Sequence, residues 1–255
     1  MIPPAMILVR PQLGMNIGMA ARAMWNFALD DMRLVAPRDG WPNPDAGPPA
    51  AGADHLLARV AVYPAVAEAL GDCALTFATT VRPRHMAKPV VTPREAAEMI
   101  RHAAARGLKS GILFGPERSG LTSDDLAPVQ TIVTCPVNPE FGSLNLAQAV
   151  LLVAHEWFQA GTSAAAEAMA SERDPEPHIP APHADVAALI AHLQQELEAA
   201  GYFHVPTRAA ATRRMLAELL SRPQFSAVEV RTLRGVIRAL AAGPRRRQLP
   251  PADEA

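Results

Sequence analysis

The sequence of 255 residues has few of the residues that bind metals or cross-link chains. Its two cysteines, Cys73 and Cys135, lie far apart in apolar stretches without a Cys-x-x-Cys pair, which predicts buried thiols in a reducing cytoplasm. The eight histidines form no His-x-x-x-His or His-Glu-x-x-His pattern, so no metal is expected. The N-terminus lacks the features of a signal peptide, and no apolar stretch reaches the roughly 18 residues of a membrane span. We therefore expect a cytoplasmic protein with no membrane partner.

An excess of charge of one sign is missing too. Lys and Arg number 24 against 25 for Asp and Glu, a formal net charge of −1, which argues against a protein that coats nucleic acid by charge alone. Only Lys88 and Lys109 are lysine, and every other basic residue is arginine. A GC-rich genome explains this preference, but arginine is also the residue that grips phosphate with two donors. A hydrophobic content of 49% with 19% charged residues excludes bulk disorder.

The first 160 residues alternate between short apolar runs and helical patterns. This alternation is typical of an α/β fold with a parallel sheet that is buried on both faces. Strands are expected at Met6–Arg10, Met32–Ala36, Arg59–Tyr63, Ala74–Thr79, Gly111–Gly115 and Thr131–Cys135, and helices at Asn16–Ala28, Ala65–Leu70, Pro93–Arg106 and Leu144–Gln159. The stretch Asp39–Gly52, rich in Pro, Gly and Ala, is expected to be an exposed loop.

The composition changes after residue 160. Residues 161–182 contain four prolines and four acidic side chains against one basic side chain, which predicts a semi-stiff, solvated linker. Amphipathic stretches follow at 184–200, 207–221 and 226–242, so residues 183–255 are expected to form a small all-α extension.

The charge of this extension is uneven. Its ten arginines all lie between Arg208 and Arg247, a span in which Glu218 and Glu229 are the only acids, for a net charge of +8. Such a run is either a set of solvated helix faces or a surface for a phosphate backbone. The sequence pattern alone does not choose between the two interpretations.

Several common motifs of α/β enzymes are absent. No Gly-x-Gly-x-x-Gly follows the first strand, and neither a phosphate-binding loop ending in Gly-Lys-Ser/Thr nor a Gly-x-Ser-x-Gly elbow occurs. These absences argue against dinucleotide-binding enzymes, P-loop nucleotide hydrolases and α/β-hydrolases.

A first distinctive stretch, Gly14–Met24, follows the first expected strand. Asn16 is a candidate N-cap, and Gly18 with three alanines makes a thin helix that another backbone can approach. Arg22 lies on this otherwise apolar helix. It is either a snorkelling or ion-paired side chain or a functional residue.

A second stretch, Ile112–Thr122, runs from an apolar strand into a turn that presents Glu117 and Arg118. Open α/β sheets bind ligands at the carboxyl ends of their strands, but a surface turn with a local ion pair would look the same. Thr122 and Asp125 resemble a capping box at the start of a short helix.

A third stretch, Pro136–Ala147, leads into an apolar helix. Gly142 and Ser143 at the entrance of that helix would leave backbone N–H groups free for polar atoms of a ligand. Ser143 could equally be a plain N-cap.

Together the three stretches resemble the motifs of the SpoU branch of the SPOUT methyltransferases. These are S-adenosylmethionine-dependent RNA 2′-O-methyltransferases whose α/β fold contains a deep trefoil knot. The motifs Asn-x-Gly-x-x-x-Arg, Phe-Gly-x-Glu-x-x-Gly-Leu and Asn-x-x-x-x-Ser-Leu-Asn occur in this order within residues 5–160. The extension, at Leu197–Phe203 and Glu229–Gly235, is similar to that of bacterial members that methylate nucleotide 32 in the tRNA anticodon loop.

The resemblance implies a homodimer in which Arg22 of one subunit faces the methyl-donor pocket of the other, with a knot formed by about residues 111–160 and no metal. The implied catalytic residues are Arg22, Asn16, Glu117, Ser143 and Asn145. The implied S-adenosylmethionine-binding residues are Thr79, Thr80, Val81, Gly115, Cys135, Gly142, Ser143 and Leu144. Expected RNA contacts are Arg118, Arg213, Arg214 and Arg234.

Chemistry limits the role that Arg22 can have. A guanidinium with a pKa above about 12 is a poor general base, so Arg22 is expected to orient the ribose and its phosphate and to stabilise the developing alkoxide. Two alternatives remain open at this point. One is the same chemistry at another tRNA or rRNA site, and the other is a catalytically inactive RNA-binding module.

Overall fold

A computed structural model describes residues 2–81, 88–162, 179–204 and 206–242. Its centre is a seven-stranded sheet in the order β3-β2-β1-β6-β4-β7-β5, and every strand pair is parallel. The strands are β1 (Ala5–Val9), β2 (Met32–Val35), β3 (Ala61–Tyr63), β4 (Leu75–Thr79), β5 (Val90–Val91), β6 (Ser110–Phe114) and β7 (Thr131–Val133). The expected parallel α/β fold is therefore confirmed.

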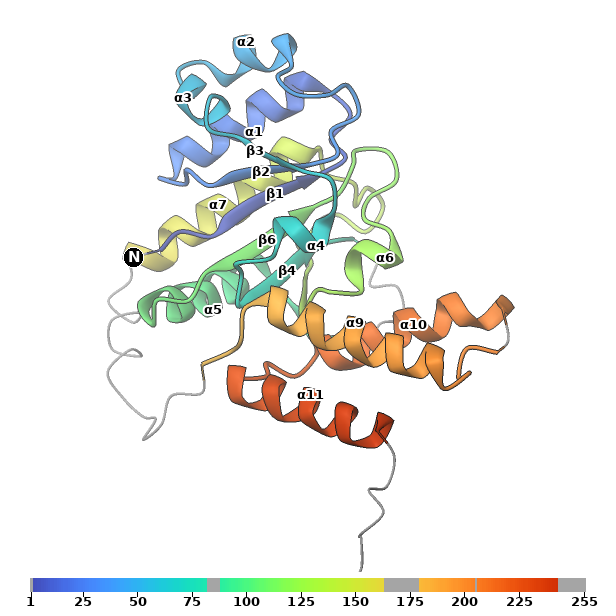
Figure 1. Ribbon diagram of the computed structural model, residues 1–255. Helices are drawn as coiled ribbons and strands as arrows, with labels where there is room; N and C mark the ends of the chain where they lie inside the picture. Colours follow the sequence, from blue (N-terminus) through green and yellow to red (C-terminus); the bar gives the residue numbers. More distant parts are fainter. Residues whose placement is uncertain (1, 82–87, 163–178, 205, 243–255) are drawn as a thin grey trace, which may run out of the picture.

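Helices cover both faces of the sheet (Figure 1). On one face α1 (Gly14–Asn26), α5 (Pro93–Ala105) and α7 (Leu146–Thr162) pack over the larger of two core clusters. On the other face lie α4 (Val66–Ala69) and α6 (Ser123–Leu126). The inner strands β1 and β6 are buried along their whole length, because crossover helices cover both faces of a parallel sheet, whereas the edge strands β3 and β5 are partly exposed.

The stretch Asp39–Gly52 corrects an expectation. It was expected to be an exposed loop, but it contains a 3-10 helix, η1 (Pro44–Ala46), and a short helix, α2 (Gly47–Ala50), followed by α3 (Asp54–Leu57). Ala46 and Ala50 are fully buried. A side chain at Gly18 of α1 would overlap the carbonyl oxygen of Ala46. The thin face of α1 thus packs against a backbone segment of the same chain.

The C-terminal extension is helical, as expected, and consists of α9 (His183–Ala199), α10 (Pro206–Ser221) and α11 (Ala227–Ala241). It has its own small core, which includes Val186, Leu189 and Val230. The extension contacts the α/β domain, where the His183 and Ala184 amides donate to the Cys73 and Gly71 carbonyls at 2.8 and 3.2 Å. Of the expected linker 161–182, residues 163–178 lie outside the described residues.

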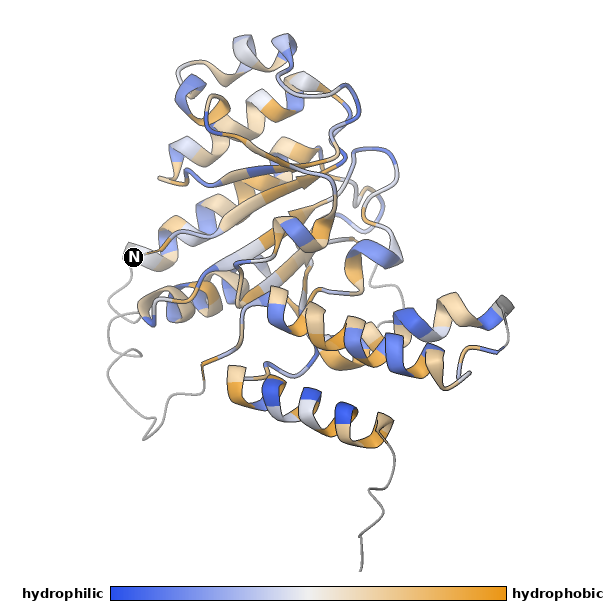
Figure 2. Ribbon diagram, in the orientation of Figure 1, coloured by the Kyte–Doolittle hydropathy of each residue, from blue (hydrophilic) through white to orange (hydrophobic). Residues whose placement is uncertain are grey.

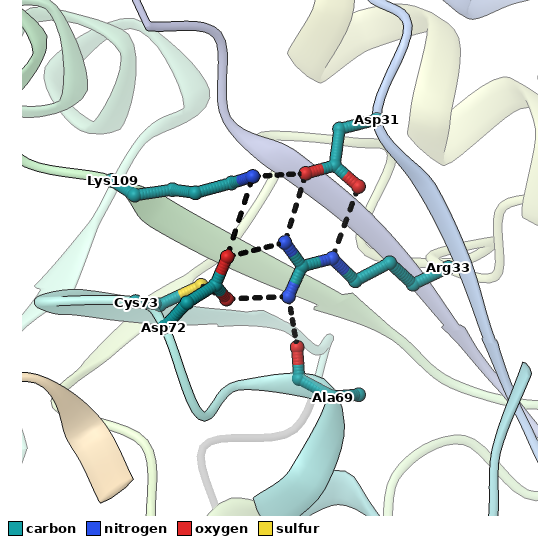
Figure 3. A network of polar contacts seen from close by, with 6 residues as sticks. All are labelled: Asp31, Arg33, Ala69, Asp72, Cys73 and Lys109. Atoms are coloured by element: carbon teal, nitrogen blue, oxygen red, sulfur yellow. Dashed lines mark hydrogen bonds and ion pairs between the residues drawn. The ribbon is translucent and has the colours of Figure 1, made fainter. Parts of the chain in front are cut away.

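An ion-pair network lies at the amino-terminal ends of β2, β4 and β6 (Figure 3). Arg33 of β2 is 5% exposed and its guanidinium donates five hydrogen bonds, to both carboxylate oxygens of Asp31, both of Asp72 and the Ala69 carbonyl. Lys109 contacts the same carboxylates at 2.5 and 3.4 Å. All five N–H groups of the guanidinium are therefore satisfied, which is the condition for burying it.

Candidate active site

The three motif stretches meet at the carboxyl ends of β1, β6 and β7 (Figure 1). Asn16 of the first stretch is not an N-cap, because α1 already begins at Gly14 and Leu13 holds the capping position. Asn16 is instead a buried residue of the first helical turn. Its amide Nδ2 donates to Glu117 Oε1 at 2.8 Å, and its Oδ1 accepts from Asn145 Nδ2 at 3.0 Å. One residue from each motif thus joins a single hydrogen-bonded chain.

Glu117 anchors this chain at the second motif. Its other oxygen, Oε2, accepts from the backbone N–H of Gln12 at 2.9 Å. Both carboxylate oxygens are therefore occupied in holding the β1–α1 connection and α1. Glu117 thus connects the second motif to the helix that carries Arg22. The alternative interpretation of this stretch, a surface turn with a local ion pair, is not supported, because the described side chains of Glu117 and Arg118 form no ion pair with each other.

A cavity of about 560 Å³ opens beside this network. Its wall contains all eight residues that the family resemblance assigns to the cofactor: Thr79, Thr80, Val81, Gly115, Cys135, Gly142, Ser143 and Leu144. Glu117, Arg118 and the motif residue Leu121 also line it, as do residues that the motifs did not indicate, including Pro139, Glu140, Phe141 and Ala149. The motif pattern could not find these last residues, because only the tertiary packing of the third stretch and of α7 brings them to the cavity.

The cavity fits S-adenosylmethionine in size and in chemistry. Its volume lies in the range of small-ligand sites, and Arg118 is the one basic side chain among the described residues that line it. The Thr79 hydroxyl donates to the Leu113 carbonyl at 3.0 Å, and the Thr80 carbonyl accepts from the Thr134 hydroxyl at 2.9 Å. A Cβ at Gly115 would lie 2.5 Å from the Leu121 nitrogen. The wall is thus built from closely packed backbone, with the Thr79 side chain turned into the fold.

Two further wall residues can be placed chemically. Cys73 is buried as expected, but Cys135 is only half-buried, because it lies in the cavity wall, and this partial burial raises the pKa of its thiol. Ser143 lies in the cavity wall but is not the N-cap of α7, which begins at Leu146. Asn145 takes that role, because its Oδ1 accepts from the Ala147 amide at 2.8 Å.

Arg22 lies outside this cavity, in a groove of about 430 Å³ between α1 and α7. The side chain is exposed, and the described residues offer it neither a hydrogen bond nor an ion pair. Asn145 lines the same groove. Of the five implied catalytic residues, Asn16, Glu117 and Asn145 are brought together directly, Ser143 lies in the cavity, and Arg22 is separate from the cavity within one chain.

The expected RNA-binding arginines have different environments. Arg213 forms an ion pair with Glu198 and stacks over the Phe203 ring at 4.1 Å. Arg214 is paired with Asp124 of α6 at 2.6 Å, and Arg118 is exposed at the cavity. Arg234 is half-buried, with an Nε that has no partner. Exposed arginines without ion pairs in the described extension are Arg208, Arg222, Arg231 and Arg238.

Other classes of site lack support in the described part of the chain. There, no group of three or more His, Cys, Asp or Glu side chains is arranged to hold a metal ion. None of the described helices is long and apolar enough to cross a membrane.

A parallel α/β sheet whose strand ends carry three linked motifs around a cavity defines an RNA methylase of the SpoU type. The chain matches the SpoU rRNA Methylase family over residues 3–155 and belongs to it. The resemblance seen in the sequence is thereby confirmed, and with it the methyltransferase class.

Similar proteins extend the likeness to the C-terminal helices. The chain is 34% identical over 236 residues to "tRNA (cytidine/uridine/adenosine-2′-O-)-methyltransferase TrmJ" of Pseudomonas aeruginosa (strain UCBPP-PA14), covering 91% of both chains. It is 31% identical to the TrmJ of Escherichia coli O6:K15:H31, covering 92% and 93%. The crystal structure of TrmJ from Z. mobilis ZM4 matches with a TM-score of 0.82 at 54% identity, covering 93% of this chain and 98% of that chain.

Proposed function

We propose that this protein is an S-adenosylmethionine-dependent methyltransferase that modifies the ribose 2′-oxygen of nucleotide 32 in the tRNA anticodon loop, as a cytoplasmic homodimer. The observation that carries the proposal is the chain of hydrogen bonds from Glu117 through Asn16 to Asn145, which fixes the Arg22 helix beside a cavity of cofactor size. The full-length similarity to tRNA methyltransferases named TrmJ supports tRNA as the substrate. Nucleotide 32 follows from the resemblance of the extension.

The chain's own residues mainly have to align two reactants. S-adenosylmethionine bound in the cavity supplies a methyl group on a positively charged sulfur. The guanidinium of Arg22 offers a positive charge and five N–H donors, so it binds the ribose and adjacent phosphate and stabilises negative charge on the 2′-oxygen. Asn16, Glu117 and Asn145 hold the helix that bears Arg22, because a displacement depends on alignment of the reacting atoms.

The proposed homodimer would bring Arg22 to the cavity of a second subunit. Support comes from apolar side chains that remain exposed on the two helices beside Arg22. Met15 and Met19 of α1 are 54% and 41% exposed, and Leu151 and Leu152 of α7 are each 40% exposed. Exposed apolar residues concentrated on neighbouring helices mark an interaction surface.

A knotted path is part of the same proposal. Strand β7 enters the sheet between β4 and β5, two strands that precede it in sequence. After β7 the chain passes through the loop that lines the cavity and enters α7, so the proposed knot lies within residues 111–160. This order of strands supports threading of the chain near its cofactor loops.

Replacing Arg22 by alanine tests the proposed reaction. We expect Arg22→Ala to reduce methyl transfer to an unmodified tRNA transcript by at least about 100-fold, the usual effect of removing a transition-state electrostatic contact. S-adenosylmethionine affinity, measured by calorimetry, should stay within about twofold of the wild type, because Arg22 does not line the cavity of its own subunit and its proposed contacts are with the ribose and phosphate of the RNA.

Arg22→Lys is the matched control, since it keeps the charge and loses the planar fork. It should recover only part of the lost activity. Unchanged turnover of Arg22→Ala would refute the role of Arg22. A methyl group mapped to a base nitrogen in the wild-type product, or to another nucleotide, would refute the reaction or its site.

A further inference from the structure

The short helix α6 directly follows the cavity loop of the second motif. It begins two residues after Leu121, which lines the cavity. The backbone nitrogen of Leu121 packs so tightly on Gly115 that a Cβ at Gly115 would lie 2.5 Å from it. The position of α6 therefore fixes the loop between Gly115 and Leu121, and an element that holds α6 also holds this part of the cavity wall.

The amino-terminal end of α6 is tied to the sheet. The capping box that the sequence predicts at Thr122 and Asp125 is present, and the Thr122 N–H and hydroxyl both donate to Asp125 Oδ2 at 2.7 Å. The same carboxylate, in a residue that is 6% exposed, pairs with both terminal nitrogens of Arg10, the residue that follows β1. Asp125 thus anchors α6 within the α/β domain.

The C-terminal extension contacts the α6 segment at both ends, where α9 and α10 lie beside it (Figure 1). In the first turn, Asp124 Oδ1 accepts a hydrogen bond from Arg214 Nε of α10 at 2.6 Å. Just beyond the last turn, the buried imidazole of His183 in α9 donates to the Pro128 carbonyl. Two helices of the extension therefore hold the helix that positions the cavity loop.

Arg214 is placed differently from the exposed arginines of the extension. Its side chain is 38% exposed and Asp124 already neutralises it, whereas Arg231 and Arg238 of α11 are exposed and have no ion pair among the described residues. A phosphate would have to displace the Asp124 carboxylate to reach the Arg214 guanidinium. This geometry favours a link between α10 and α6 over an RNA contact for Arg214.

We propose that α6 couples the extension to the cofactor cavity, with the Arg214–Asp124 ion pair as the link. The inference rests on the proposed function: tRNA bound by the extension restrains α10 and, through Asp124, the loop that lines the cavity. Asp124 and Arg214 are positioning residues, because neither lines the cavity and neither contacts RNA. Coupling between two binding sites is reciprocal, so cofactor and tRNA tighten each other's binding by the same factor.

Binding of S-adenosylhomocysteine, the product that remains after methyl transfer, measures this coupling without turnover. Calorimetry on the full chain, with and without a saturating unmodified tRNA transcript, gives the ratio of the two affinities. We expect a ratio of about fivefold for the wild type, at the low end of couplings between sites, because an exposed ion pair contributes little by itself.

Exchanging the two charges separates the ion pair from other effects. Asp124→Arg and Arg214→Glu each bring like charges together and should reduce the affinity ratio to less than about twofold. The double variant with both changes restores the pair in the opposite direction and should recover most of the wild-type ratio. Asp54→Arg is the matched control, since Asp54 is also an exposed aspartate in the first turn of a four-residue helix, and its ratio should equal that of the wild type.

Filter binding and methyl transfer to the same transcript complete the test. A wild-type affinity ratio of one, single variants that keep the wild-type ratio, or an exchanged pair that does not restore it would each overturn the inference. An Arg214→Glu variant that loses tRNA affinity but keeps the ratio would overturn it too, because Arg214 would then contact RNA. In all these cases continued methylation of tRNA ribose by the wild type leaves the proposed function standing. A wild type that leaves tRNA ribose unmethylated would overturn both proposals.

Discussion

Replacing Arg33 by methionine perturbs the network at the amino-terminal edge of the sheet (Figure 3). Methionine has a similar length, so it fills most of the space of a side chain that is only 6% exposed. The change removes five hydrogen bonds at once, including two to Asp31 and two to Asp72. Lys109 remains between the two carboxylates.

The size of the effect follows from burial and from what remains. Removing one partner of a buried ion pair typically costs about 3–5 kcal/mol. The Asp72 side chain is 52% exposed and can be rehydrated, and Lys109 still neutralises part of the charge. We therefore expect Arg33→Met to lower the free energy of unfolding by about 3 kcal/mol, at the low end of that range. Arg33→Lys should recover part of the loss, because three donors on a point charge cannot span both carboxylates.

The network also predicts a pH dependence. Hydrogen bonds from Arg33 hold the pKa of Asp72 well below its usual value. Burial opposes the ionisation of Asp31, but hydrogen bonds from Arg33 and Lys109 outweigh it, so its pKa is also lowered. A lowered folded-state pKa gives stability that is present above the unfolded value of about 3.9 and is lost as the pH falls below it. Arg33→Met should flatten this loss between about pH 4 and pH 2.

Urea unfolding of the full chain, followed by circular dichroism at several pH values, measures both effects. Arg38→Met is the control, because Arg38 forms an exposed pair with Asp39 and should change stability little. A loss below about 1 kcal/mol for Arg33→Met, with the acid dependence of the wild type retained, would refute the view that this network stabilises the fold.

Two other predictions concern packing and charge. Gly18→Ala should destabilise the chain by about 1–3 kcal/mol through overpacking, since its Cβ would overlap the Ala46 carbonyl. Gly235→Ala in α11 meets open space and should stabilise the chain by about 0.5–1 kcal/mol. Thermal unfolding measures both variants, and midpoints that shift in the same direction would refute the reasoning. The double change Arg231→Glu and Arg238→Glu should weaken tRNA binding at least about tenfold at low salt, because both side chains are exposed on α11. Filter binding across a salt series checks it, and equal affinities of variant and wild type would exclude this face of α11 from the interface.

Much of the fold could be predicted because its signals are local. The strand expected at Met6–Arg10 is Ala5–Val9, and the helix expected at Pro93–Arg106 is Pro93–Ala105. A proline in the first turn and a complete Thr92–Glu95 capping box mark the start of that helix in the sequence itself.

The errors arose where tertiary contacts decide the structure. Asn16 has the sequence position of an N-cap, but its partner Glu117 is 101 residues away and no local pattern reveals it. Strand β5 has only two residues, too few for an alternating pattern. The Asp39–Gly52 stretch has the composition of a loop, and only the close approach of Gly18 shows why Ala46 is buried there.

Only part of the candidate site could be predicted from the sequence. The cavity residues followed from family motifs, and all eight line one cavity. The hydrogen bonds that join Asn16 to Glu117 and to Asn145 could not be predicted, because they depend on the packing of segments that lie more than 100 residues apart in the sequence. Chemistry that depends on such packing is invisible in the order of residues.

Lys88, one of the two lysines, occupies a buried position whose geometry suits an ammonium group. Lys88 is 7% exposed, and its ammonium donates to the carbonyl oxygens of Leu126, Ala127 and Val129 at the end of α6. Burial lowers the pKa of Lys88 to about 8. Three acceptors around one nitrogen match a tetrahedral ammonium, and a planar guanidinium could not reproduce them.

The arginines divide into two groups, which explains how a chain with a net charge of −1 can present a basic surface. Arg33 and Arg213 are neutralised by carboxylates within the fold. Arg231 and Arg238 are exposed on α11, where hydrophilic residues recur along the helix (Figure 2). The carboxylates paired with the first group offset its positive charge in the net total, but they form no ion pairs with Arg231 and Arg238. The net charge of the whole chain is therefore a poor guide to its surface, and the proposed attraction of a phosphate backbone depends on the exposed arginines of α11 rather than on the total.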